Sequence, residues 1–172
     1  MSLTKEEIIQ LRQKYSRPTR HPYWKQFLEF ANILSFDAFP YWYVRSQKHS
    51  LNFRFYGMQF QIAPNYRAET RTIHVDLTLK GKNADFIYKE LYETNNIVAR
   101  CKSENIIIPR TFNFGEQDRT LYAEMHIENW HNSADWSAQF DWITEKMCIL
   151  YEIFGDDISS GFADRGERPR LT

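Results

Sequence analysis

The clearest strand in the chain is the segment TIHVDLTL at residues 72–79. Its apolar residues Ile73, Val75, Leu77 and Leu79 alternate with polar ones. Because successive side chains of a strand point to opposite faces of a sheet, this pattern predicts one buried face and one face in contact with water. An antiparallel or mixed sheet with helices against one face fits that pattern.

Alternation of the same kind occurs on both sides of this segment. Before it, residues 51–55 and 58–62 alternate apolar and polar side chains, which predicts two antiparallel strands or one strand with a central kink. Pro64 is expected to end that run. After it, two shorter strands are predicted near residues 110–114 and 119–128.

Two helices are predicted ahead of the strands. The first covers about residues 5–15, because TKEE at residues 4–7 is a capping box and a thin apolar stripe follows it. The second covers about residues 22–34, where Pro22 suits the first helical turn. Apolar side chains surround most of this second helix, so we expect it to be deeply buried.

Two more helices follow at about residues 84–102 and 135–154, where apolar side chains recur at spacings of four and three. Gly155 is expected to cap the last helix. The order of elements predicts an α+β domain: an antiparallel or mixed sheet of about five strands with two N-terminal helices, one middle helix and one C-terminal helix. We assign residues 1–158 to this single domain and residues 159–172 to a polar C-terminal tail.

Aromatic side chains make up 16% of the chain, with 13 Phe, 10 Tyr and 5 Trp, and most of them are expected in the core. A chain of 172 residues can bury a stable core without a disulfide or metal. Cys101 and Cys148 are therefore expected to be buried thiols, and no cofactor is expected. Without an apolar signal-peptide core or a long apolar run, we expect a cytoplasmic protein that does not enter the membrane.

Charge is distributed unevenly along the chain, although the net charge is zero. Residues 1–82 contain 13 Lys/Arg and 6 Asp/Glu, whereas residues 83–172 contain 9 and 16. Zero net charge argues against a general binder of polyanions. Either the two halves stay apart in space and the molecule is dipolar, or the fold interleaves them and their fields cancel.

Aromatic and basic residues interleave over about thirty positions near the predicted strands. The set consists of Tyr41, Trp42, Tyr43, Arg45, Lys48, Arg54, Arg67 and Arg71. Rings that stack on bases and cations that pair with phosphates are what binders of single-stranded nucleic acid require. The alternative is that the rings fill the core and the cations keep the strands in contact with water.

Histidines and carboxylates gather on the polar faces of two predicted strands. They are His74, Asp76, Glu124, His126 and Glu128. If the two strands are neighbours, these side chains could hold a divalent metal and support a hydrolase or nuclease. The alternative is a solvated sheet face with cross-strand polar pairs.

Sequence motifs give little support to catalysis. The chain has no Glu-x-Lys triplet of the PD-(D/E)XK nucleases, no phosphate-binding glycine loop and no Gly-x-Ser-x-Gly. We therefore assign no catalytic residue.

Several aromatic positions have a familiar order. They are Tyr23-Trp24, the strand at residues 73–79, Lys82-Asn83, Trp136, Phe140, Trp142-Ile143 and Phe154. Over residues 20–155 this resembles a bacterial domain family of unknown function, number 4268 of that series, found alone or C-terminal to nuclease-like domains. The resemblance implies a fold and an association with nucleic-acid-processing proteins, but no catalytic residues. The chain lacks the nuclease domain, so an accessory role would require a partner in trans.

Three hypotheses follow. The first is a non-catalytic accessory module that binds protein or nucleic acid, in a DNA-processing or defence context. The second is a metal-dependent hydrolase that uses the histidines and carboxylates of the sheet. The third is a self-assembling domain whose surplus aromatic surface forms a homodimer.

Overall fold

The computed structural model describes residues 4–17, 21–35, 42–55, 60–80, 84, 88–89, 93, 97–109 and 119–159. Five strands form one antiparallel sheet in the order β1-β2-β3-β4-β5. They are β1 (Trp42–Gln47), β2 (Ser50–Phe55), β3 (Phe60–Arg67), β4 (Thr72–Leu79) and β5 (Arg119–His126). The helices are α1 (Lys5–Tyr15), α2 (Pro22–Ser35), α4 (Ile97–Ser103) and α5 (Trp136–Ser159), with a short 3₁₀ turn η1 (Ser133–Asp135) before α5.

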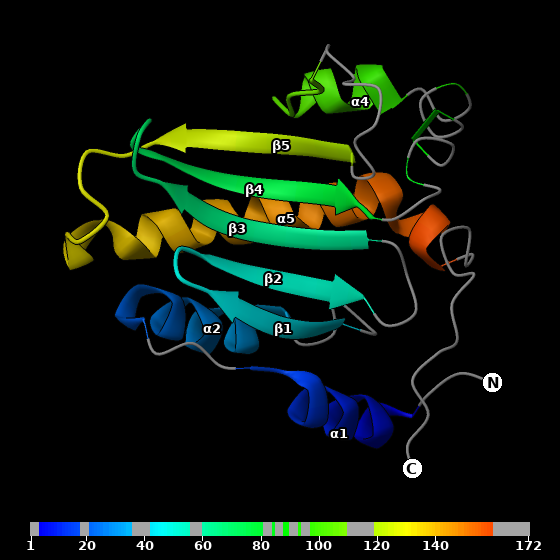
Figure 1. The fold of residues 1–172 in the computed structure, drawn as a ribbon, viewed down its shortest axis with the longest axis horizontal. Helices are drawn as coiled ribbons and strands as arrows, with labels where there is room; N and C mark the ends of the chain where they lie inside the picture. The colour runs from blue at the N-terminus through cyan, green and yellow to red at the C-terminus, as the bar shows by residue number, and fades with distance from the viewer. Residues whose placement is uncertain are drawn as a thin grey trace.

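The helices lie on one face and at the two edges of the sheet (Figure 1). Helices α2 and α5 cover one face, α1 lies beside β1, and α4 lies beyond β5. The opposite face is turned toward the viewer in Figure 1, and no described helix crosses it. The α+β class predicted from the sequence is confirmed.

Aromatic rings form the centre of the layer between the sheet and the two helices. Tyr23, Trp24 and Phe27 of α2 are fully buried. The ring of Phe27 lies 6.4 Å from that of Phe53 on β2 and 5.6 Å from that of Phe140 on α5. One helix is therefore joined to both the sheet and the second helix by edge-on or tilted ring contacts. The prediction of an aromatic-rich core is confirmed.

Both edges of the sheet are partly covered by short chain segments. Arg17, just after α1, forms a parallel bridge with Arg45 of β1, and Ile107 forms an antiparallel bridge with Tyr122 of β5. The Ser16 hydroxyl also accepts a hydrogen bond from the Val44 N–H at 3.1 Å. Satisfying edge N–H and C=O groups in this way reduces strand addition by other chains.

Several local predictions are confirmed. Helix α1 begins with the predicted capping box, in which the Glu7 N–H donates to the Thr4 hydroxyl and the Thr4 N–H donates to the Glu7 carboxylate. Helix α2 and strand β4 match their predicted ranges within a residue. Cys101 and Cys148 are free thiols; Cys101 is buried, as predicted, whereas Cys148 is only half-buried.

Pro64 does not end its strand, so that prediction was wrong. It pairs with Val75 inside β3. The Tyr66 N–H donates toward the β1–β2 turn, to the His49 carbonyl at 2.9 Å, so Pro64, two residues earlier, directs its nitrogen toward β2 as well. The missing donor therefore weakens the β2–β3 ladder and leaves β3–β4 pairing intact.

Two further differences concern β1 and α5. Strand β1 was not predicted, because its apolar alternation extends over Trp42 and Val44 alone. Helix α5 continues through Gly155 to Ser159, so Gly155 is not its cap. An interior glycine costs a helix about 1 kcal/mol, which the packed turns before it can offset.

Other predicted segments are described in part. The strand predicted at residues 110–114 and the tail at residues 160–172 lie outside the described residues. Of the predicted middle helix, residues 84, 88, 89, 93 and 97–103 are described, and all are helical. Within the described ranges, no helix has the length and apolar character needed to cross a membrane.

Candidate functional site

The strand register shows which side chains share the face that no described helix covers, here called the open face. Arg45 pairs with Asn52, and Arg54 pairs with Gln61, which pairs with Thr78. In the same way Ala63 pairs with Asp76, and Asn65 with His74. Directly paired residues of an antiparallel sheet share a face, so these polar side chains lie together, opposite the aromatic core.

Charge changes sign across the open face. Each strand contributes one Lys, Arg, Asp or Glu to it, and in strand order these are Arg45, Arg54, Arg67, Asp76 and Glu124. Because the sheet follows chain order, strands β1 to β3 lie together on one side of this face, and β4 and β5 lie on the other. The β1–β3 side is therefore cationic and the β4–β5 side anionic, despite the zero net charge.

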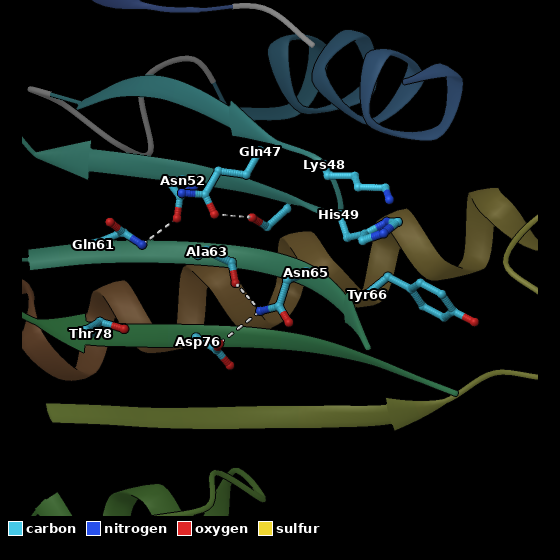
Figure 2. Close-up of a pocket in the computed structure, with 11 residues that line it drawn as sticks. Gln47, Lys48, His49, Asn52, Gln61, Ala63, Asn65, Tyr66, Asp76 and Thr78 are labelled. Atoms are coloured by element: carbon cyan, nitrogen blue, oxygen red, sulfur yellow. Dashed lines mark hydrogen bonds between the residues drawn. The ribbon is translucent and has the colours of Figure 1, made fainter. Parts of the chain in front are cut away.

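A hollow of about 500 Å³ lies over β2, β3 and β4 on the open face. Its lining includes four carboxamide side chains, those of Gln47, Asn52, Gln61 and Asn65 (Figure 2). Lys48 and His49 lie at one end, on the turn between β1 and β2. The hollow is thus lined by hydrogen-bonding groups with a cation at its rim.

Hydrogen bonds hold the carboxamides of the hollow in place (Figure 2). The Asn52 amide donates to the Arg45 carbonyl at 3.3 Å, and the Gln61 amide donates to the Asn52 side-chain oxygen. The Asn65 amide donates to the Ala63 carbonyl at 3.1 Å and to Asp76 Oδ2 at 2.9 Å. Asn52 and Gln61 are buried, with 4% and 9% exposure, although they lie on the face without helices.

The β1 side of the open face combines rings and cations. Tyr43 is half-buried against Tyr15 of α1, with ring centroids 6.0 Å apart. The Arg45 guanidinium lies 5.6 Å from the centre of the Tyr43 ring, and the Lys14 ammonium lies 5.5 Å from that of Tyr15. Helix α1 therefore adds a second ring and cation to those predicted from the strands.

Three residues of the predicted aromatic and basic binding set are not placed on the open face by the structure. Trp42 lies on the helix side of β1, where its ring packs 4.9 Å from that of Phe53 and under Arg12. It is 8% exposed and cannot stack on a ligand at the open face. Arg71 lies on the β3–β4 turn with φ 51°, and Tyr41 is outside the described residues.

Arg67 is on the open face but already has a carboxylate partner. Its Nη2 lies 3.3 Å from Asp76 Oδ2, and its guanidinium lies 5.8 Å from the centre of the Tyr122 ring. The side chains of Arg67 and Asp76 are 45% and 15% exposed. Arg45, Arg54 and Lys48 are therefore the stronger candidates for binding an anion.

Four of the five residues of the metal hypothesis lie on the neighbouring strands β4 and β5, and Glu128 follows the end of β5. His74 pairs with Glu124, with Nε2 3.3 Å from Glu124 Oε2, and His74 Nδ1 lies 3.7 Å from Asp76 Oδ1. The His74 ring also stacks on Tyr122 at 5.0 Å. His126 and Glu128 form a separate, exposed pair at 3.5 Å.

This arrangement fits cross-strand pairing better than a metal centre. His74 is 3% exposed, whereas His126 and Glu128 are 61% and 86% exposed, so the five groups do not converge. Among the described residues, no group of three or more His, Cys, Asp or Glu is arranged to hold a metal ion.

An aromatic and histidine cluster contacts the hollow through Tyr66. Tyr66, which lines the hollow, stacks on Trp130 with ring centroids 4.3 Å apart and planes 9° apart. His21 stacks on the same indole at 4.6 Å, and the indole N–H donates to His131 Nε2 at 3.1 Å. Burial, followed by the nearby His49 and His131, lowers the pKa of His21. Trp130 also lies 5.2 Å from Tyr23, so this cluster joins the core to the hollow.

The hollow was not predicted from the sequence, although part of its pattern was visible. Asn52 and Gln61 occupy the polar positions of alternating segments, as do many residues that only contact solvent. Their proximity depends on the register between β2 and β3, which no local motif specifies.

No protein family model, curated protein or solved structure matches this chain. The resemblance to the bacterial domain family of unknown function stays a prediction.

Proposed function

We propose that this domain binds single-stranded nucleic acid across the open face of its sheet, as a non-catalytic interaction module. The observation that carries the proposal is the charge gradient, in which Arg45 and Arg54 lie on adjacent strands with Lys48 on the turn that joins them. Three cations along one edge of an exposed surface suit a chain of phosphates.

The hollow favours a single strand over a duplex. A duplex presents phosphates to a flat surface and keeps the hydrogen-bonding edges of its bases within its grooves. The carboxamides of Asn52 and Gln61 would then have no base edge to contact. A single strand can direct its bases toward the sheet while its phosphates reach the cations of β1 and β2.

The rings near β1 add a surface for stacking. Tyr43 and Tyr15 are both half-buried, so each keeps part of its ring exposed beside Arg45. Stacking on an exposed ring contributes about 1–3 kcal/mol per base and tolerates any base sequence. The resemblance described above would place such a module beside nucleases, in DNA processing or defence.

Fluorescence anisotropy with single- and double-stranded DNA tests the proposal. Labelled oligonucleotides of about 12 residues match the length that one small binding domain covers. We expect tighter binding of the single strand, with affinity falling as salt rises from about 50 to about 200 mM. If Arg45, Arg54 and Lys48 each contact one phosphate, a plot of log binding constant against log salt concentration should have a slope of about −2, at roughly −0.7 per contact.

A double variant localises the binding surface. Arg45→Ala/Arg54→Ala should make the salt slope shallower by about 0.7 for each contact removed. Lys25→Ala is the matched control, because Lys25 is exposed on α2, on the other side of the sheet, and should leave the slope unchanged. No detectable binding at low salt would rule out nucleic acid and leave a protein partner as the remaining form of an accessory role.

A further inference from the structure

We propose that the hollow on the open face is a pocket for one unpaired nucleobase. This inference rests on the proposed function. It adds the place on the open face where a base would bind and the side chains that would contact it. It concerns the region around Ala63, between Asn52 and Asp76, rather than the cations along β1 and β2.

The shape of the hollow comes from a small residue in a row of larger ones. Ala63 pairs with Asp76 on one side, and the β2–β3 register places Asn52 on the other. Ala63 and its two polar neighbours all line the depression of about 500 Å³ (Figure 2). That volume lies within the range of small-molecule sites and exceeds what a single side chain would fill.

The walls of the hollow carry the groups that recognise base edges. A carboxamide presents N–H donors and an oxygen acceptor side by side, as the edge of a base does, and Asn and Gln pair with adenine in this way. Gln61 uses one N–H on Asn52, and a carboxamide has a second N–H and an oxygen. Because Asn52 and Gln61 are buried and hydrogen-bonded to each other, little side-chain freedom is lost when a ligand binds.

The cations are placed for the phosphates on either side of such a base. Arg45 pairs with Asn52 and Arg54 with Gln61, so both arginines originate next to the carboxamides of the hollow. Lys48 lies at the rim. A base in the hollow would therefore have its own backbone within reach of charge-assisted hydrogen bonds.

The experiment compares strands with and without bases. The probes are oligo(dA), oligo(dT) and an abasic deoxyribose-phosphate strand of equal length, which keeps every sugar and phosphate. We expect the wild-type protein to bind a base-bearing strand roughly tenfold more tightly than the abasic strand, because the abasic strand has no base to contact the hollow.

Ala63→Leu assigns that difference to the hollow. The larger side chain would take up space at the floor of the depression on the open face, away from the aromatic core. It should lower affinity for the base-bearing strand toward that of the abasic strand and leave abasic binding unchanged. Gln61→Leu, which keeps the side-chain length and removes the carboxamide, should act in the same direction if Ala63→Leu fails to fold.

The outcomes separate this inference from the proposed function. Equal affinity of the wild-type protein for abasic and base-bearing strands would overturn the base pocket and leave a phosphate-binding face. If the variant that folds loses the same affinity for the base-bearing strand as for the abasic strand, the base pocket is also overturned. If no strand binds at low salt, the proposed function and the base pocket both fail.

Discussion

The two faces of β2 show how neighbouring residues of one strand serve different ends. Leu51 and Phe53 are buried at 0% and 2% exposure against the helices, whereas Asn52 between them lines the hollow on the opposite face. Asn52 is nearly as buried, at 4% exposure, and its carboxamide donates one hydrogen bond and accepts another. Burial by itself therefore does not distinguish the core from the candidate site; the difference is in what each group contacts.

This contrast separates stability from recognition in the structure. The helix side relies on ring contacts, such as Phe27 with Phe53 and Phe140, whose removal leaves a cavity. The open face relies on oriented amides and cations that rest on that core. Substitutions on the two faces should therefore have separable effects on unfolding and on binding.

Phe27→Ala should produce the largest effect on stability. Phe27 is fully buried, and truncating such a ring costs about 3–5 kcal/mol through lost burial and the cavity left behind. Urea denaturation of the variant and the wild-type protein measures this loss. A cost below about 1 kcal/mol would show that the aromatic layer does not hold α2 to the sheet.

Tyr23→Phe should produce a smaller loss at the same layer. The Tyr23 hydroxyl donates to Gln139 Oε1 at 3.0 Å, and Gln139 is 5% exposed. Removing the hydroxyl leaves a buried amide oxygen without this donor, which costs about 1–3 kcal/mol. A double-mutant cycle with Gln139→Leu checks the assignment, because the two losses should not add.

His21, which packs against Trp130 between the core and the hollow, should make the stability of the protein depend on pH. Burial and the neighbouring His49 and His131 lower the pKa of His21 below its ordinary value of 6.5. Near that pH the unfolded chain therefore binds more protons than the folded protein. The stability that neutral His21 contributes is present above about pH 6.5 and is lost as the pH falls.

The free energy of unfolding at about pH 7.5 and about pH 5.5 measures this effect. The wild-type protein should lose more stability on acidification than His21→Gln, which has no proton to gain at that position. Equal losses in the two proteins would show that folding does not lower the pKa of His21.

Much of the fold could be predicted from local patterns. The capping box at Thr4 and the alternation in β4 each reflect physics within a few residues, and both match the structure. The prediction that Pro64 ends its strand was wrong because its missing N–H is on the side of β2. The hydrogen bonds between β3 and β4 do not need that donor. Strand β1 was missed because its inward positions include only two strongly apolar residues, Trp42 and Val44.

The candidate site was less predictable than the fold. Arg45, Arg54 and Lys48 were identified from the interleaving of cations and rings, but Trp42 belongs to the core because it has the opposite strand parity. Asn52 and Gln61 could be recognised as neighbours in the hollow only from the β2–β3 register. Register is set by contacts across the sheet, so a single sequence read in short windows does not specify it.

The central claim is that ligand binding and fold stability occupy opposite faces of one sheet. Amide chemical-shift mapping by NMR, during titration with single-stranded DNA at low salt, tests it most directly. The largest shifts should fall on Gln47–Asn52 and Gln61–Asn65 of the open face, with little change along α5. Shifts concentrated on α2 and α5, or no shifts at all, would contradict it.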